Sequence, residues 1–214
     1  MMRRLPFAYI VYFAATGAAF PYLPVFYNDL GLDYNAIGLV AALQAATQLV
    51  TAPLWGGLAD RFPHSRMTLP AAALLAAAGA AFLLFGTEVF GAILGAVVGG
   101  VILFAGLAGI GPVLDARSLE LLGADRHRYG QVRAWGSVAF VVSATIVGVV
   151  LDRMGPRSIF AIYLPALLLT AVVTAFLPRK GTSRSASIMR GARVVLGSPG
   201  LALFLGGVFL VWTS

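Results

Sequence analysis

The sequence has no cysteine and little charge. Without cysteine, neither a disulfide framework nor a thiolate metal site can form. Charged residues make up only 11% of the 214 residues, whereas a soluble domain carries about a quarter. The apolar runs also hold no nucleophile–base pair, metal cluster or phosphate-binding loop. His64 and His127 both lie in basic segments where a solvated surface role is expected. The composition predicts a protein that is no enzyme and has no cofactor.

Long stretches without Asp, Glu, Lys or Arg fill most of the chain. They cover residues 5–28, 34–59, 67–87, 89–114, 134–151, 158–178 and 194–214. A helix needs about 20 apolar residues to cross the hydrocarbon core of a bilayer. Six of these runs reach or approach that length. The sequence therefore predicts an all-α integral membrane protein with six transmembrane helices in the lipid bilayer, formed by residues 1–177.

The seventh run is shorter in effect, because Pro199 and Gly200 interrupt it. Its continuous part, 201–214, would span about 21 Å as a helix, which is less than a bilayer. We interpret 201–214 as the start of a truncated seventh helix. A short interfacial helix that closes a six-span protein is the alternative. Residues 178–200 are rich in Ser, Gly and Arg and predict a cytoplasmic linker.

The formal charge of +7 is distributed unevenly between the loops. If each run crosses the membrane once, thirteen of the fifteen basic residues fall on one side and only Arg153 and Arg157 on the other. Basic residues accumulate in cytoplasmic loops. We therefore expect a cytoplasmic N-terminus, in a bacterial inner membrane. Because topology accounts for the charge, the sequence gives no reason to expect a nucleic-acid partner.

One loop sequence occurs twice. The first copy, "GGLADRFPHSR", contains Gly56, Asp60, Arg61 and Arg66, and the second, "GVVLDRMGPRS", contains Gly148, Asp152, Arg153 and Arg157. Both read Gly-x-x-x-Asp-Arg, and both join the second predicted helix of a triplet to the third. Because three helices separate the copies, they lie on opposite faces of the membrane. This pattern predicts a 3+3 inverted repeat, which is typical of secondary transporters.

Polar side chains recur on the second predicted helix. Gln44, Thr47, Gln48 and Thr51 follow at i, i+3, i+4 and i+7, which places them on one helix face. Polar groups inside a bilayer are costly and face a cavity or a partner helix. We favour a wall of a substrate path, with hydrogen bonds between helices as the alternative.

A second candidate site lies across the fourth and fifth predicted helices. Asp115 follows Pro112 at the end of the fourth, and Arg133, Ser137 and Phe140 share one face of the fifth at i, i+4 and i+7. Arg133 could simply anchor the helix at the membrane surface. Alternatively it pairs with Asp115 across a cavity, where the two charges would bind hydroxyls or an anionic group.

The segments "GAAFPYLPVFYNDL", "GGLADRFPHSR", "GPVLDARSLE" and "YGQVRAWGSVAF" together resemble the major facilitator superfamily. Within it, the chain is similar to the branch of lactose permease-like sugar/proton symporters and phenylpropionate permease-like proteins. The resemblance implies the N-terminal half of a twelve-helix fold. It also implies that Asp60 and Arg61 hold a cytoplasmic gate, although Pro63 and Ser65 replace the usual Gly and basic residue.

The same resemblance implies roles for the second site. An acidic residue late in helix four and an Arg early in helix five bind sugar hydroxyls in these relatives, and an aromatic residue seven positions later stacks on the sugar ring. Asp115, Arg133 and Phe140 match those places. Asp stands for the usual Glu and Phe for the Trp of galactoside permeases. Other sugars, nucleosides and aromatic acids are therefore open as substrates.

We thus expect a secondary active transporter that carries a small polar solute by alternating access, as a proton symporter. Its partners would be the solute, protons, and a missing C-terminal half or a second copy of the chain. In the relatives the proton-carrying carboxylate lies in the second half. The alternatives are a non-transporting membrane scaffold or receptor subunit of the same fold, and a six-helix unit that works as a homodimer.

Overall fold

The structure, a computed structural model, describes residues 4–178 and Gly200. The chain divides into two compact units, residues 1–181 and 182–214. The predicted linker over 178–200 and the partial helix over 201–214 therefore lie almost entirely outside the described residues. Within 4–178 the chain forms helices and no strand. The predicted all-α class is confirmed for this part of the chain.

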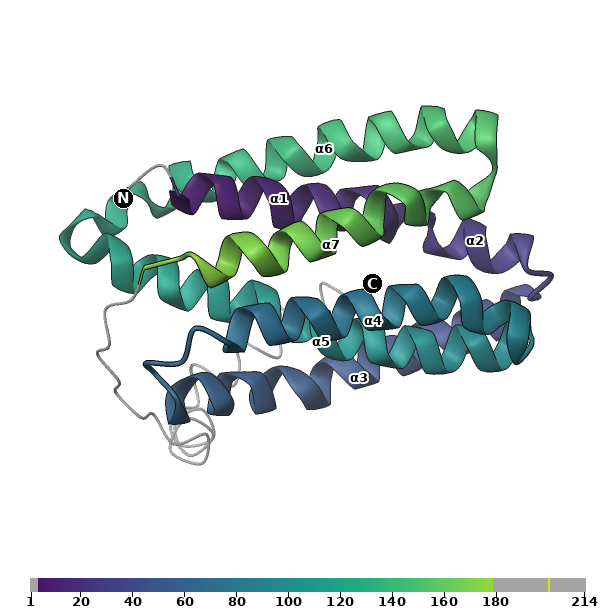
Figure 1. The fold of residues 1–214 in the computed structure, drawn as a ribbon, viewed down its shortest axis with the longest axis horizontal. Helices are drawn as coiled ribbons and strands as arrows, with labels where there is room; N and C mark the ends of the chain where they lie inside the picture. The colour runs from purple at the N-terminus through teal and green to yellow at the C-terminus, as the bar shows by residue number, and fades with distance from the viewer. Residues whose placement is uncertain (1–3, 179–199, 201–214) are drawn as a thin grey trace. The chain divides into compact units, whose positions relative to one another are not determined.

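The helices of residues 4–178 succeed one another with short connections (Figure 1). The elements are α1 (Arg4–Ala19), η1 (Phe20–Tyr22), α2 (Leu23–Asp29), α3 (Tyr34–Arg61), α4 (Thr68–Val89), α5 (Ala92–Leu122), η2 (Gly123–Arg128), α6 (Tyr129–Met154), η3 (Pro156–Ser158) and α7 (Ile159–Ala175). Among the described residues, five helical stretches are long and apolar enough to cross a membrane. One of them, Ala92–Met154, contains α5, η2 and α6 together.

The first apolar run is not one continuous α-helix. α1 ends at Ala19, a 3-10 turn follows over Phe20–Tyr22, and α2 begins at Leu23. Pro21 and Pro24 stand at the starts of the last two elements. Proline has no backbone N–H and therefore removes an i to i−4 hydrogen bond. The two prolines explain why the helix changes its winding here.

The fourth and fifth predicted helices, α5 and α6, are longer than their charge-free runs. The charge-free runs 89–114 and 134–151 leave residues 115–133 between them, but α5 continues to Leu122 and α6 begins at Tyr129. The hydrocarbon limits only how many consecutive apolar residues are needed, so a helix can continue into the aqueous phase with charged side chains on its outer face. The buried residues Ser118 and Leu122 keep this extension packed. Asp115 and Arg133 consequently lie inside helices.

The helices approach one another most closely at glycines, which have no side chain. The most extensive helix pairings are α4–α5, α1–α6, α3–α5, α4–α7 and α1–α7. A Cβ atom on Gly79 of α4 would collide with the backbone of Leu103 in α5, and one on Gly106 of α5 would collide with that of Ala76. Gly17 of α1 contacts the backbone of Phe140 in α6 in the same way. Small residues at helix contacts are typical of membrane proteins.

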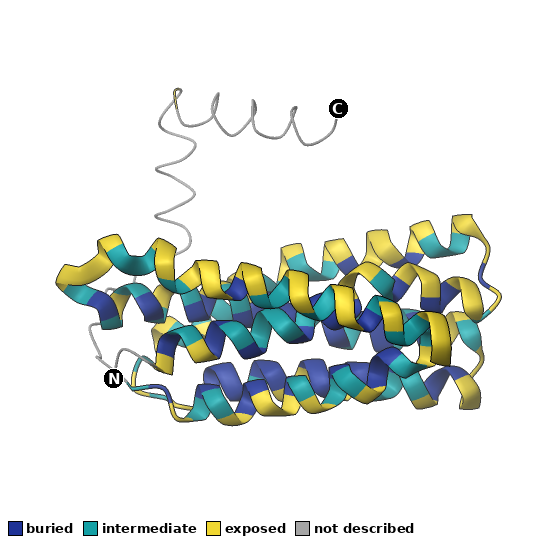
Figure 2. Ribbon diagram, turned by 90° about the horizontal axis from the view of Figure 1, so that it is seen from above, coloured by how far each residue is buried: buried dark blue, intermediate teal, exposed yellow. Residues whose placement is uncertain are grey.

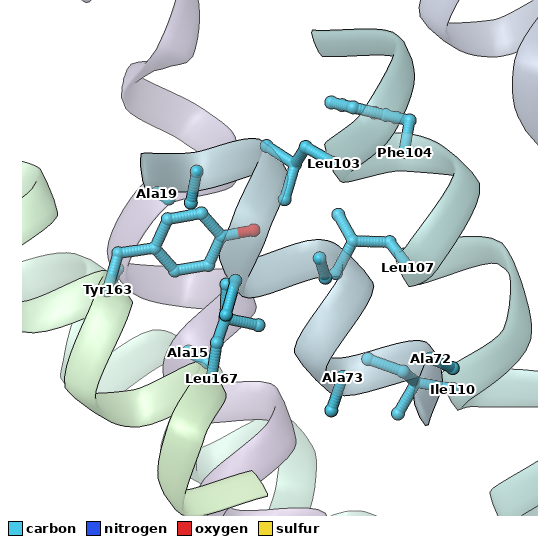
Figure 3. Packing of buried hydrophobic residues seen from close by; sticks show 14 of the residues in the cluster. Ala15, Ala19, Ala72, Ala73, Leu103, Phe104, Leu107, Ile110, Tyr163 and Leu167 are labelled. Atoms are coloured by element: carbon cyan, nitrogen blue, oxygen red, sulfur yellow. The ribbon is translucent and has the colours of Figure 1, made fainter. Parts of the chain in front are cut away.

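The buried core lies between these helices. Figure 3 shows the ring of Tyr163 from α7 pointing into a cluster that includes Ala15 and Ala19 of α1 and Leu103 of α5. By contrast, large apolar side chains on α3 and α6 are exposed, among them Leu49, Val50, Leu54, Val141, Val142 and Ile146 (Figure 2). Exposed apolar helix faces of this extent are expected where lipid or another membrane segment replaces water.

The helix pairings follow a regular pattern. The first triplet consists of α1 with η1 and α2, then α3, then α4, and the second consists of α5, α6 and α7. Exchanging the triplets converts the pairing α1–α6 into α5–α3 and α1–α7 into α5–α4, and it leaves α4–α7 unchanged. The two Gly-x-x-x-Asp-Arg segments end α3 and α6, at opposite ends of the bundle (Figure 1).

We expect Gly79→Ala to destabilise the bundle. The added methyl group meets the backbone of Leu103, which cannot move aside as a flexible side chain would. Overpacking of this kind costs about 1–3 kcal/mol. The measurement is the thermal unfolding midpoint of the purified protein in detergent. Gly38→Ala in α3 is the control, because a Cβ there has nothing within 4 Å. Equal midpoints for the two variants would contradict the prediction.

Candidate functional site

Two opposite charges on neighbouring helices form an ion pair. Nη1 of Arg133, in the first turns of α6, lies 3.6 Å from Oδ2 of Asp115 in α5. The short η2 turn reverses the chain between the two helices and brings these residues together (Figure 1). The side chains are 51% and 31% exposed, respectively. Arg133 is therefore the more accessible partner, and a polar ligand could reach it.

Each member of the ion pair also forms a hydrogen bond with a tyrosine. The hydroxyl of Tyr9 in α1 donates a hydrogen bond to Asp115 Oδ1 at 2.6 Å. Nη1 of Arg133 donates to the hydroxyl of Tyr129 at 3.2 Å. The resulting network joins α1, α5 and α6. The sequence did not reveal Tyr9, because it lies 106 positions before Asp115 and no local spacing connects them.

A cavity of about 510 Å³ lies between α1, α3 and α5. Its lining residues include Tyr12, Thr16, Phe20, Gln48 and Pro112. Tyr12 follows Tyr9 by three residues and Pro112 precedes Asp115 by three, so each lies about one helical turn from the network. The ion pair thus lies next to one end of a partly polar, partly aromatic cavity.

The polar stripe on α3 is divided between two environments. Gln48 lines the cavity. Gln44 is buried, and its Nε2 donates to the hydroxyl of Tyr27 in α2 at 2.6 Å. The hydroxyls of Thr47 and Thr51 donate to carbonyls of their own helix, those of Leu43 and Thr47. Gln44 therefore makes the contact between helices that the sequence left as the alternative, whereas Gln48 lines the cavity and its role in a substrate path stays a prediction.

The remaining predicted site residues lie on α6. Ser137 is exposed, and Phe140 is partly buried, with its backbone against Gly17 of α1. Both follow Arg133 towards the middle of the helix. Their roles toward a substrate stay predictions.

The first loop motif occupies the end of α3 and the connection to α4. Gly56, Asp60 and Arg61 lie in the last turns of α3, and Arg66 lies in the connection. Asp60, Arg61 and Arg66 are exposed. The guanidinium of Arg61 lies 6.0 Å from the centre of the Phe62 ring.

The connection after α3 is attached to α5, because Nη2 of Arg117 donates to the carbonyl oxygen of Ser65 at 2.8 Å. The second motif is held differently. Gly148, Asp152 and Arg153 lie in the last turns of α6, and Arg157 in η3 forms an ion pair with Glu88 near the end of α4. Both partners of that pair are exposed, so it contributes little stability.

Within the described residues, no group of three or more His, Asp or Glu side chains is close enough to hold a metal ion. The candidate site consists of a cation, a carboxylate and phenol hydroxyls beside a cavity between apolar helices.

Residues 2–204 of the chain match the family model described as "MFS_1 like family". This chain belongs to that family. The resemblance to the major facilitator superfamily is confirmed, and the chain is an integral membrane protein of a transporter family.

The chain is 32% identical over 212 residues to the maltose permease of Geobacillus stearothermophilus, in a match that covers 97% of this chain and 52% of that protein. It is 28% identical over 189 residues to the raffinose permease of Escherichia coli, with 85% and 43% covered. The chain thus spans about half the length of these curated relatives. No solved structure matches it significantly.

We expect alanine substitutions of the two glutamines of α3 to differ in their effect on stability. Gln44→Ala leaves the buried hydroxyl of Tyr27 without its partner and opens a void, which costs about 1–3 kcal/mol of stability for the hydrogen bond alone. Gln48→Ala removes a side chain from the cavity wall and is expected to change the unfolding midpoint little. Thermal unfolding of both purified variants checks this. The division of the stripe is wrong if Gln48→Ala is the more destabilising.

Proposed function

We propose that this chain forms part of a secondary active transporter that carries a sugar across the membrane by alternating access. The observation that supports it most is the Asp115–Arg133 ion pair next to the cavity between α1, α3 and α5. Charges are rare among apolar membrane helices and are typical of substrate or ion paths.

The chemistry of the site suits a sugar. Each sugar hydroxyl can both donate and accept a hydrogen bond. Arg133 offers N–H donors in a rigid plane, Asp115 offers carboxylate oxygens, and the Gln48 amide offers both donor and acceptor groups. Tyr12 and Phe20 add aromatic surface to the cavity wall, and Phe140 is the aromatic residue that the resemblance to sugar permeases nominates for stacking. Apolar C–H faces of a sugar ring pack on such surfaces.

The names of the relatives support the same substrate class. Both are permeases, one named for maltose and one for raffinose. We propose an oligosaccharide as the substrate, in preference to a nucleoside or an aromatic acid.

Alternating access needs two halves that move against each other. We propose that six helices, α1 with α2 and then α3 to α7, form one half as a 3+3 inverted repeat. The exchangeable helix pairings and the matching ends of α3 and α6 support the repeat. The second half would be a further six helices or a second copy of this chain. In this arrangement residues 56–66 contribute to the cytoplasmic gate, in an inner membrane of a bacterial cell with the N-terminus in the cytoplasm.

Arg133→Ala tests the site in the protein expressed from its complete reading frame. We expect the dissociation constant for maltose or raffinose to rise by about 10- to 100-fold, because hydrogen bonds to a charged group are worth about 1.5–3 kcal/mol. Equilibrium binding measures the dissociation constant, and uptake of the radiolabelled sugar measures transport. Arg126→Ala, which changes an exposed arginine in η2, is the control and should retain uptake. Unchanged binding by a correctly inserted Arg133→Ala protein would remove Arg133 from the site.

Proton coupling predicts a second result. Accumulation of the sugar above its external concentration should collapse when a protonophore dissipates the proton gradient, because a symporter uses that gradient as its only energy source. Exchange of labelled for unlabelled sugar across the membrane should persist, since it needs no net proton movement. Accumulation that resists the protonophore but requires a sodium gradient would contradict proton symport while leaving sugar transport in place.

A further inference from the structure

Tyr9 lies in the core, yet its hydroxyl reaches the candidate site. The residue is 1% exposed, and its ring stacks on Phe13 with the ring centres 6.2 Å apart. Its hydroxyl donates a hydrogen bond to Oδ1 of Asp115 at 2.6 Å. A tyrosine ring has only two side-chain torsions. With the ring packed, the position of the hydroxyl is fixed as well.

This contact divides the two oxygens of the Asp115 carboxylate between two partners. Oδ1 accepts the hydrogen bond from Tyr9, and Oδ2 faces Nη1 of Arg133. Bonds from a hydroxyl to a carboxylate are short and strong. Because one oxygen is held, the plane of the carboxylate is set, and so is the direction in which the other oxygen points.

The position of the Arg133 guanidinium is restrained as well. Both contacts that the described residues make with Arg133, to Asp115 Oδ2 and to the hydroxyl of Tyr129, use Nη1. Nη2 and Nε take part in neither contact and belong to a side chain that is half exposed, so a ligand can reach their N–H groups. A guanidinium is planar, so fixing Nη1 at two points also fixes where the free donors point.

We propose that Tyr9 is a positioning residue of the substrate site. Its buried hydroxyl holds the carboxylate of Asp115, and the carboxylate in turn holds the guanidinium of Arg133 toward the substrate. At 1% exposure Tyr9 itself does not touch the ligand. The inference rests on the function proposed above, because it names a residue that acts on that site from outside it.

A second tyrosine provides a matched control. The hydroxyl of Tyr22 in η1 donates to the backbone carbonyl of Ala144 in α6, also at 2.6 Å. Both hydrogen bonds join the first helical stretch to a later helix, and both are lost on substitution by Phe. Only the bond of Tyr9 ends on a member of the ion pair. A purely structural role predicts the same result for the two substitutions.

The experiment compares Tyr9→Phe with Tyr22→Phe in the protein expressed from its complete reading frame. Equilibrium binding of maltose and raffinose and the thermal unfolding midpoint are measured for each. We expect the dissociation constant to rise about tenfold in Tyr9→Phe and less than about twofold in Tyr22→Phe, with similar shifts of the midpoint. An unchanged dissociation constant in Tyr9→Phe, or equal rises in both variants, overturns the proposal.

A double-mutant cycle shows whether Tyr9 acts through Asp115. In an Asp115→Ala background, Tyr9→Phe should cause no further loss, because the acceptor is already gone. The cycle is measured on sugar affinity, and on the unfolding midpoint if the Asp115→Ala protein binds no sugar. Additive effects overturn the proposal. If the unchanged protein binds neither sugar, the proposed function fails, and the midpoint cycle still decides whether Tyr9 and Asp115 are coupled.

Discussion

A charge between apolar helices has to be paired, and this constraint organises the site around Asp115. An unpaired carboxylate among such helices costs several kcal/mol. The structure supplies a hydroxyl from α1 and a guanidinium from α6. Both partners must reach the same side chain on α5, so the distances between three helices are limited by one network. Gly17 helps to meet that limit, because its missing side chain lets the backbone of α1 approach that of α6 at Phe140.

The helices differ in how firmly they are packed. α4 and α5 approach each other through glycines at several levels, and most of α4 faces the core. α3 and α6 have few buried residues and carry rows of exposed apolar side chains. Yet Gln48 on α3 and Arg133 on α6 belong to the candidate site. The two least buried long helices thus contribute polar groups to the candidate site.

Much of the fold could be predicted from charge alone, because charged residues mark helix ends in a bilayer. The Gly-x-x-x-Asp-Arg segments end α3 and α6. The same rule fails where a helix continues beyond its apolar run, as α5 does to Leu122. The break over Phe20–Tyr22 follows from Pro21 and Pro24. A hydropathy pattern does not reveal such a break, because it does not record how proline affects the backbone of a helix.

The site was accessible from the sequence only in part. Arg133 and Asp115 are polar residues inside or beside apolar runs, so they attract attention by themselves. Tyr9 does not, since aromatic residues are common in apolar helices, and only the tertiary structure brings its hydroxyl to Asp115. For the Gln44–Thr51 stripe, in contrast, the sequence predicted a single role for residues that the structure separates. Helical spacing places these residues on one face, but Gln44 turns into the core toward Tyr27, while Gln48 lines the cavity.

The candidate site and the first loop motif are both connected to α5. Asp115 and Arg117 are two residues apart on α5, and Arg117 donates to the carbonyl of Ser65 in the connection that follows α3. An α-helix is stiff over so short a distance, so a displacement of α5 moves both groups together. The second motif is held differently, since Arg157 pairs with Glu88 near the end of α4. The two motifs are alike in sequence but are held by different partners, and Arg117 connects the segment after the first motif directly to the helix that carries Asp115.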